Sequence, residues 1–129
     1  MSEDWQNRTH ILIGDEGIEK LRNAHVLVVG LGGVGGYAAE QLARAGIGEM
    51  TIVDCDTVNI TNKNRQLLAL DSTIGRHKTE VMAERIRDIN PEIRLHVMTQ
   101  YLKDQSIIDL MTQKFDFVVD AIDTLAPKV

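Results

Sequence analysis

The sequence predicts a doubly wound α/β fold with a mostly parallel sheet. Short, apolar, often β-branched runs recur along the 129 residues, and each is followed by a longer segment with helical spacing. A glycine-rich turn over residues 30–36 joins the first such run to the first of these helical segments. Strands that alternate with helices pair in parallel through right-handed crossovers, and ligands collect at the carboxyl ends of the strands.

The first strand is expected over residues 25–29, which form a continuous apolar run typical of a strand covered on both faces. A short helix is expected before it, over residues 11–22, anchored by Ile18 and Leu21. A longer helix is expected after the glycine-rich turn, with one apolar face made by Val34, Ala38, Ala39, Leu42 and Ala43. Gly46 and Gly48 follow where a helix end favours positive φ.

The second strand is expected over residues 50–53 and ends at Asp54. A polar stretch without a clear period follows, and then a helix over residues 78–90 that Pro91 ends. The remaining elements are a strand over 94–98, a helix from Asp104 with Ile107, Ile108 and Met111 on its inner face, and a strand over 115–119. A doubly wound sheet usually continues beyond a fourth strand, so we expect a truncated domain. Truncation there would expose Val118 and Val119 and favour self-association.

Composition narrows the function classes. The chain is 43% hydrophobic and 26% charged, which is typical of a globular protein, and its 19 acidic residues outnumber 14 basic ones. This balance gives no overall electrostatic signal for nucleic acid. No apolar run reaches the about 20 residues needed to cross a bilayer, and no signal peptide is evident, so we expect a cytoplasmic protein. The single cysteine, Cys55, excludes an internal disulfide and is interpreted as structural, because neighbouring aspartates disfavour a thiolate.

The glycine-rich turn contains Gly30, Gly32 and Gly35 with G-x-G-x-x-G spacing, directly after a strand and before a helix. Glycines there permit a tight turn and let backbone N–H groups approach a phosphate or a ribose. The pattern therefore favours a Rossmann-like nucleotide site over the alternative that the glycines only allow close packing. Asp54 lies where a carboxylate commonly binds ribose hydroxyls, although it could instead cap a turn. These features leave NAD and ATP open.

The polar stretch favours a triphosphate, because closely spaced anions need cations and polar groups around them. Arg65 is interpreted as functional, and Lys78 likewise, since a cation at a helix start opposes the helix dipole unless an anion lies nearby. Thr61 could bind a phosphate or cap a turn. Ordinary structural roles are expected for Lys63, Arg76 and His77.

Two carboxylates, Asp120 and Asp123, follow the fourth strand. Oxygen ligands beside a triphosphate suit Mg²⁺, and Asp123 is the preferred partner of the metal. Asp120 could instead brace the glycine-rich turn. The alternative is that both aspartates only cap turns.

The ordered set of these residues resembles the adenylation domain shared by ubiquitin-activating enzymes and the bacterial activators of sulfur-carrier proteins. The resemblance covers residues 8–123 and rests on Arg8, the glycine motif, Asp54-x-Asp56, Asn62-x-x-Arg65-Gln66, Lys78 and Asp120-x-x-Asp123. Further details are similar to one branch, the tRNA threonylcarbamoyladenosine dehydratases: Arg8-Thr9 before Leu12-Ile13-Gly14, Asn62-Lys63-Asn64-Arg65-Gln66, Ile89-Asn90-Pro91 and Asp120-Ala121-Ile122-Asp123.

The resemblance implies that residues 25–129 are the nucleotide-binding half of such a domain, preceded by a helical segment over 1–24. It implies ATP and Mg²⁺ as cofactors and formation of an acyl-adenylate. Arg65, Lys78 and Asp123 would be catalytic. The nucleotide would be bound by Arg8, Gly30, Gly32, Gly33, Asp54, Thr61, Asn62, Arg65, Lys78 and Asp123.

Partners also follow from the resemblance. Arg8 would reach across a homodimer into the partner's site. The acyl substrate would be a modified tRNA or, alternatively, a small ubiquitin-like carrier protein. An NAD-dependent oxidoreductase and a non-catalytic nucleotide-binding module are the alternatives from other classes.

Overall fold

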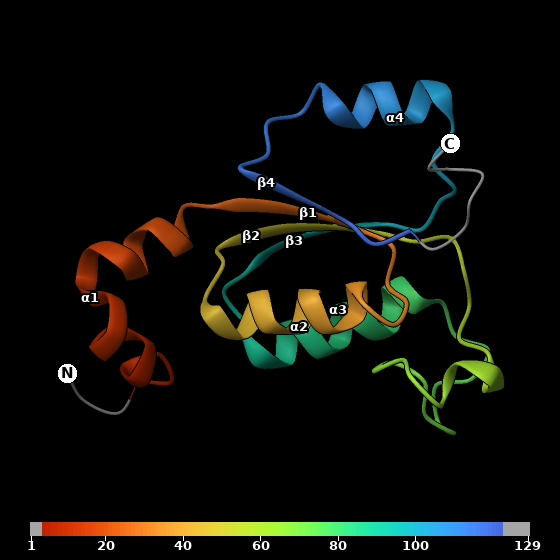
Figure 1. The fold of residues 1–129 in the computed structure, drawn as a ribbon, viewed down its shortest axis with the longest axis horizontal. Coiled ribbons are helices and arrows are strands. Elements are labelled where there is room, and N and C mark those ends of the chain that lie inside the picture. The colour runs from red at the N-terminus through yellow and green to blue at the C-terminus, as the bar shows by residue number, and fades with distance from the viewer. Residues whose placement is uncertain (1–3, 123–129) are drawn as a thin grey trace.

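The computed structural model describes residues 4–122 and contains a four-stranded, entirely parallel sheet (Figure 1). The strand order is β3-β2-β1-β4, so the first and fourth strands of the described residues are hydrogen-bonded neighbours. The strands are β1 (His25–Val29), β2 (Glu49–Val53), β3 (Arg94–Met98) and β4 (Phe117–Asp120). The predicted doubly wound α/β fold is confirmed, with strand limits within two residues of those expected.

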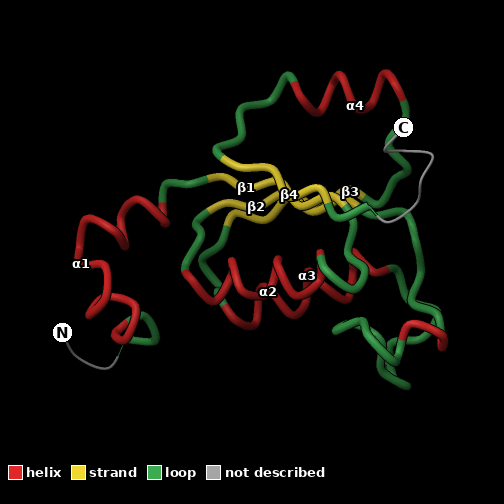
Figure 2. Tube along the Cα trace, in the orientation of Figure 1, coloured by secondary structure: helices red, strands yellow, loops and turns green. Residues whose placement is uncertain are grey.

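Helices cover both faces of the sheet (Figures 1 and 2). Two of them, α2 (Gly35–Ala45) and α3 (Lys78–Ile89), pack side by side on one face, and α4 (Asp104–Met111) lies on the other. A short 3₁₀ turn, η1 (Ile60–Asn62), lies within the polar stretch. The first helix, α1 (Asn7–Arg22), extends away from the end of the sheet where the strands begin, and it is kinked at Gly14.

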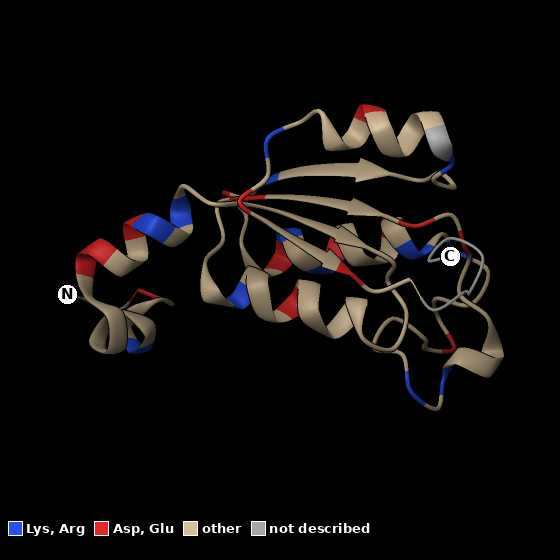
Figure 3. Ribbon diagram, turned by 45° about the horizontal axis from the view of Figure 1, so that its top comes forward, with Lys and Arg blue, Asp and Glu red and all other residues tan. Residues whose placement is uncertain are grey.

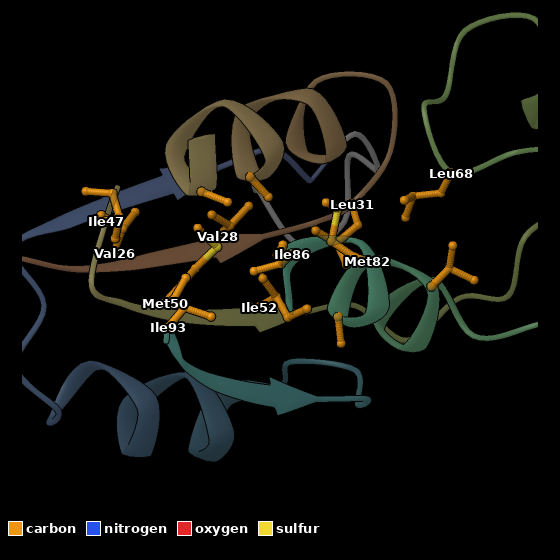
Figure 4. Close-up of a cluster of buried hydrophobic side chains, with 14 of the residues drawn as sticks. Val26, Val28, Leu31, Ile47, Met50, Ile52, Leu68, Met82, Ile86 and Ile93 are labelled. Carbon is orange, nitrogen blue, oxygen red and sulfur yellow. The ribbon is translucent and has the colours of Figure 1, made fainter. Parts of the chain in front are cut away.

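The main core lies between the sheet and the α2–α3 layer (Figure 4). Fully buried side chains of β1 and β2, such as Val28 and Ile52, meet Met82 and Ile86 of α3. Successive side chains of a strand point to opposite faces of the sheet, so the other residues of β1 and β2 point towards α4. The smaller core on that side contains Leu27, Val29, Val53 and Leu110.

Three details of the predicted elements are wrong. Val34 precedes α2 and is 71% exposed, because the glycine turn, rather than the apolar face, sets the helix start. Gly46 has the expected positive φ of 97°, but Gly48 does not; a Cβ at Gly48 would lie 1.7 Å from the Arg22 carbonyl oxygen. The packing residue of α4 is Leu110 at 2% exposed, whereas Ile107, Ile108 and Met111 are partly exposed.

Some apolar side chains at the sheet edge remain exposed, as predicted for this region. Phe117 is 69% exposed and Val118 is 46% exposed, while Val119 is partly buried against the main core. None of the helices in residues 4–122 is both long enough and apolar enough to cross a membrane.

Candidate nucleotide-binding site

A recess opens at the carboxyl ends of the strands, beside the start of α3. Its volume is about 130 Å³, below the about 300 Å³ at which ligand pockets usually begin. A nucleotide bound here would therefore extend out of the recess across the glycine-rich turn. The lining residues are Val29, Gly30, Gly32, Val53, Asp54, Cys55, Asp56, Lys78, Gln100, Tyr101, Leu102, Ala121 and Ile122.

The glycine-rich turn is shaped by close backbone contacts. Gly30 has a φ of 93°, and a Cβ on it would lie 2.7 Å from the carbonyl oxygen of Ala121. A Cβ on Gly35 would lie 1.6 Å from the carbonyl oxygen of Gly30. Gly33 differs, because a Cβ there would meet Arg65 at an ordinary 3.8 Å. Close packing therefore accounts for Gly30 and Gly35, whereas Gly33 has free space next to the Arg65 side chain.

The Asp54 carboxylate ties the end of β2 to this turn. One oxygen accepts a hydrogen bond from the Leu31 backbone N–H at 2.7 Å, and the other accepts one from the Asp56 N–H at 2.7 Å. Asp54 also lines the recess, so it holds the turn in place at the same position where a ribose was expected. The brace that we considered for Asp120 is thus made by Asp54. Asp120 accepts a bond from the Ile122 N–H instead.

Lys78 lies at the first position of α3 and lines the recess. The residue is only 6% exposed, and within residues 4–122 no hydrogen bond or ion pair to its ammonium group is found. A buried cation without a partner is costly unless an anion approaches it. The α3 start also carries no side-chain cap, so its unpaired N–H groups add to the local positive potential. Together these groups make the start of α3 locally positive.

The polar stretch brings Arg65 near Gly33 of the glycine-rich turn, while Asn62 lies inside the stretch. The Asn62 side-chain oxygen accepts a bond from the Asn59 N–H at 2.8 Å, and this buried residue holds η1 together. Arg65 is exposed, next to Gly33, and donates to the Thr61 carbonyl and to Asn64. Thr61 donates its hydroxyl hydrogen bond to Asn59, which is the turn-capping role that we left open for it.

The remaining charged residues of the stretch have structural partners, as expected. Lys63 forms an ion pair of 2.6 Å with Asp71, and Arg76 pairs with Glu80 and Glu84 at the side of α3. His77 is the residue that precedes α3. These pairs neutralise the two cations, whereas Arg65 and Lys78 have no acidic partner among residues 4–122.

Cys55 lines the recess without being activated. Partial desolvation and the Asp56 and Asp54 carboxylates raise the pKa of its thiol, and the thiol donates weakly to Asp56 at 3.6 Å. A raised pKa disfavours the nucleophilic thiolate. The structural interpretation of this residue is consistent with that environment.

Of the predicted site residues that the structure describes, Gly30, Gly32, Asp54 and Lys78 line the recess, whereas Arg8, Gly33, Thr61, Asn62 and Arg65 do not. Arg8 is exposed on α1, which extends from the opposite end of the sheet (Figure 1). Asp123 lies outside the described residues. Sequence reasoning missed Gln100, Tyr101 and Leu102, which form the wall that follows β3. Their position directly after a strand was the available signal, since loops at the carboxyl ends of strands line such sites.

The ThiF family profile matches residues 6–129, which is nearly the whole chain. The chain belongs to the ThiF family. It is similar to the tRNA threonylcarbamoyladenosine dehydratase of Escherichia coli strain K12, at 45% identity over 131 aligned positions that cover 99% of this chain and 49% of the relative. It is also similar to the molybdopterin-synthase adenylyltransferase of the same strain, at 39% identity over 93% of this chain and 49% of that relative.

Among solved structures, the fold matches that of the E. coli tRNA N6-threonylcarbamoyladenosine dehydratase in complex with ATP. The TM-score is 0.91 at 45% sequence identity, over 98% of this chain and 54% of that one. This ThiF-family chain therefore spans about half the length of the curated relatives that it matches.

Proposed function

We propose that this ThiF-family chain binds MgATP as part of an enzyme that adenylates a carboxylate. A substrate carboxylate attacks the α-phosphate of ATP, the bond to the pyrophosphate leaving group breaks, and an acyl-adenylate and pyrophosphate result. The observation that supports this most strongly is Lys78, a buried cation for which the described residues supply no anionic partner, in a recess that the glycine-rich turn also lines. The relative whose structure contains ATP supports the same ligand.

We assign the residues of the site as follows. Residues 25–129 supply the nucleotide-binding half, in which the glycine turn (Gly30, Gly32, Gly33) lies along the nucleotide. Asp54 accepts hydrogen bonds from the ribose with its remaining lone pairs. Arg65 and Lys78 neutralise the phosphates, helped by Asn62 and Thr61.

Magnesium fits the chemistry of this edge of the sheet, because carboxylate oxygens and phosphates are its preferred ligands. Both oxygens of Asp54 already accept backbone hydrogen bonds, so this carboxylate is a poor candidate. We therefore propose Asp123, which comes shortly after β4, as the residue that holds Mg²⁺ together with the phosphates. Bound Mg²⁺ would supply charge neutralisation during attack on the α-phosphate.

A homodimer in the cytoplasm is part of the proposal. Arg8 is far from the recess of its own chain, on a helix that extends outward, and so it is suited to reach a partner's site. We expect Arg8→Ala and Lys78→Ala variants to bind ATP weakly on their own. Mixing them should restore tighter binding, since one site of each mixed dimer has both residues. Unchanged weak binding in the mixture would count against a shared site.

Among acyl substrates, we favour the threonylcarbamoyl carboxylate of a modified tRNA nucleoside, which would cyclise with loss of AMP. Support comes from the higher identity to the dehydratase, 45%, than to the molybdopterin-synthase adenylyltransferase, 39%. A ubiquitin-like carrier protein remains the second candidate because of that adenylyltransferase. Along α1 the acidic residues Asp15, Glu16 and Glu19 lie between Arg8 and the pair Lys20 and Arg22 (Figure 3), so this helix presents no continuous basic stripe and tRNA would bind mostly elsewhere.

Isothermal titration with ATP, with and without Mg²⁺ and with NAD as control, tests the proposal. We expect Mg²⁺-dependent ATP binding and no NAD binding. Arg65→Ala should weaken ATP binding more than AMP binding, whereas Lys63→Ala, which removes a nearby cation already paired with Asp71, should change neither. Saturable NAD binding without ATP competition would overturn the proposal in favour of an oxidoreductase.

A further inference from the structure

Three side chains that commonly bind metals meet at the end of the sheet opposite to the recess. His25 and Glu49 are the first residues of β1 and β2 and are register partners, and His96 lies on β3 beside Thr51. His25 lies on the same face of β1 as Leu27 and Val29, which pack against Leu110 under α4. Through the strand register, Glu49 and His96 share that face.

The candidate ligand atoms are close enough for one ion. Nε2 of His96 lies 2.7 Å from Oε2 of Glu49, and Nδ1 of His25 lies 3.8 Å from the same oxygen. All the candidate ligand atoms lie within 4.8 Å of one another. Tetrahedral zinc with bonds near 2.0–2.2 Å places its ligand atoms roughly 3.4 Å apart. Small side-chain rotations therefore bring these three atoms to metal-binding distances.

The surroundings orient the ligands. Nε2 of His25 is hydrogen-bonded to the Thr51 hydroxyl at 2.8 Å, and Thr51 is only 2% exposed. The other ring nitrogen, Nδ1, is the one nearer to Glu49, and the ring packs edge-on against Phe115. Metal-binding histidines usually have their second nitrogen held in this way.

Glu49 directs one carboxylate oxygen, Oε2, to the two histidines and the other, Oε1, to Arg94. Nε of Arg94 lies 3.6 Å from Oε1, which is the oxygen that faces away from the histidine pair. Oε2 is thus available while Oε1 is fixed by the guanidinium.

We propose that His25, Glu49 and His96 bind a divalent transition metal, with zinc the best match, and leave a fourth position open to water. Two imidazoles and one carboxylate suit zinc, whereas Mg²⁺ and Ca²⁺ prefer oxygen ligands alone. The His96 side chain is 54% exposed, which gives the ion a path from solvent. The site lies at the other end of the strands from the recess and does not depend on the proposed adenylation.

The test is a titration of the full chain with ZnCl₂ against a chromophoric chelator. We expect one zinc per chain, and we expect His96→Ala to lower the affinity by at least about 10-fold. Thr51→Val should lower it by about 10- to 100-fold, the usual effect of losing the partner of a ligating histidine. His10→Ala is the matched control, because His10 pairs with Asp15 on α1, away from the cluster. Its zinc affinity should equal that of the wild type.

Cobalt(II) gives a second measurement that does not rely on the variants. A tetrahedral site of two imidazoles and a carboxylate should give strong visible bands without a thiolate charge-transfer band. A thiolate band would instead place the ion at Cys55 and overturn the proposal. The proposal is equally overturned if no 1:1 zinc binding occurs, or if folded His96→Ala and Glu49→Gln chains, checked by circular dichroism, bind zinc as the wild type does.

Discussion

The carboxylate of Asp54 is hydrogen-bonded at 2.7 Å to the backbone N–H of Leu31, and so it fixes the glycine-rich turn to the end of the neighbouring strand. Both residues lie where the nucleotide was expected, which gives Asp54 a structural role in addition to any contact with a ribose. The shape of the turn, and hence of the recess, then depends on a side chain from the next strand.

Asp54→Ala should lower the free energy of unfolding by about 1–3 kcal/mol, because two backbone N–H groups lose a charged acceptor. Urea unfolding measures this change. Asp56→Ala is the control, since among residues 4–122 its carboxylate accepts only a weak thiol hydrogen bond at 3.6 Å, so its loss should leave stability nearly unchanged. Equal losses in both variants would show that the brace to Leu31 is unimportant.

Gly30→Ala and Gly33→Ala should separate packing from nucleotide binding. A Cβ at Gly30 clashes with Ala121 at a φ of 93°, so this variant should lose more than about 1 kcal/mol of stability. Gly33→Ala should fold normally, because its Cβ has room, yet should bind ATP more weakly if the nucleotide lies along the turn. Thermal unfolding and ATP titration of both variants provide the comparison, and a strongly destabilised Gly33→Ala chain would contradict it.

Glu40 of α2, which is 8% exposed, pairs with Arg85 of α3, and Arg44 lies nearby. The hydrogen bond from Arg85 holds the pKa of the Glu40 carboxyl below its usual value of 4.5, although desolvation opposes the shift. A lowered folded-state pKa stabilises the fold above pH 4.5, and this contribution disappears as the pH falls through the folded-state value.

Glu40→Gln should therefore be less stable than the wild type at pH 7, by about 1–2 kcal/mol, and the difference should shrink on acidification. Urea unfolding at a series of pH values measures it. Glu92→Gln, at an exposed position where no ion pair forms among the described residues, should match the wild type throughout. A difference that grows as the pH falls would have the wrong sign for this pair.

Leu110 is the side chain through which α4 packs on the sheet. Leu110→Ala should cost about 2–5 kcal/mol, as for other buried leucines, and should expose α4 to limited proteolysis. Ile108→Ala, on the same helix but 56% exposed, should change the free energy of unfolding by less than about 0.5 kcal/mol. Similar losses of stability in both variants would show that Ile108 also packs against the sheet, as the sequence pattern predicted.

Self-association can be checked at the sheet edge. Phe117 and Val118 are 69% and 46% exposed, and an exposed apolar edge strand promotes association. Val118→Lys should therefore reduce the apparent mass in sedimentation velocity at high concentration. A wild-type chain that sediments as a monomer at every concentration would refute this expectation.

The strands and most helices could be predicted because each depends on local pattern. Residues 25–29 are continuously apolar, and Pro91 ends α3 regardless of tertiary context. The wrong predictions concern positions whose conformation or burial is set by contacts with a segment distant in the sequence. Gly48 is required by the Arg22 carbonyl, and the orientation of α4 follows from the apolar patch around Leu27.

The same distinction applies to the site. Lys78 could be selected because a cation at a helix start contradicts the local dipole, and the structure places it in the recess. The brace from Asp54 and the wall made by Gln100, Tyr101 and Leu102 depend on which strands are neighbours. Neighbouring strands are set by the long-range topology, which no local pattern specifies.

The strand order has a consequence for the timing of assembly during synthesis. Since β4 pairs with β1, the chain that emerges first from the ribosome can pair β1, β2 and β3 while its glycine turn still lacks Ala121 and Ile122. The part of the recess that Ala121 and Ile122 line is therefore completed only after β4 has been made. A ligand that needs the whole recess could therefore stabilise the chain only after β4 has paired with β1.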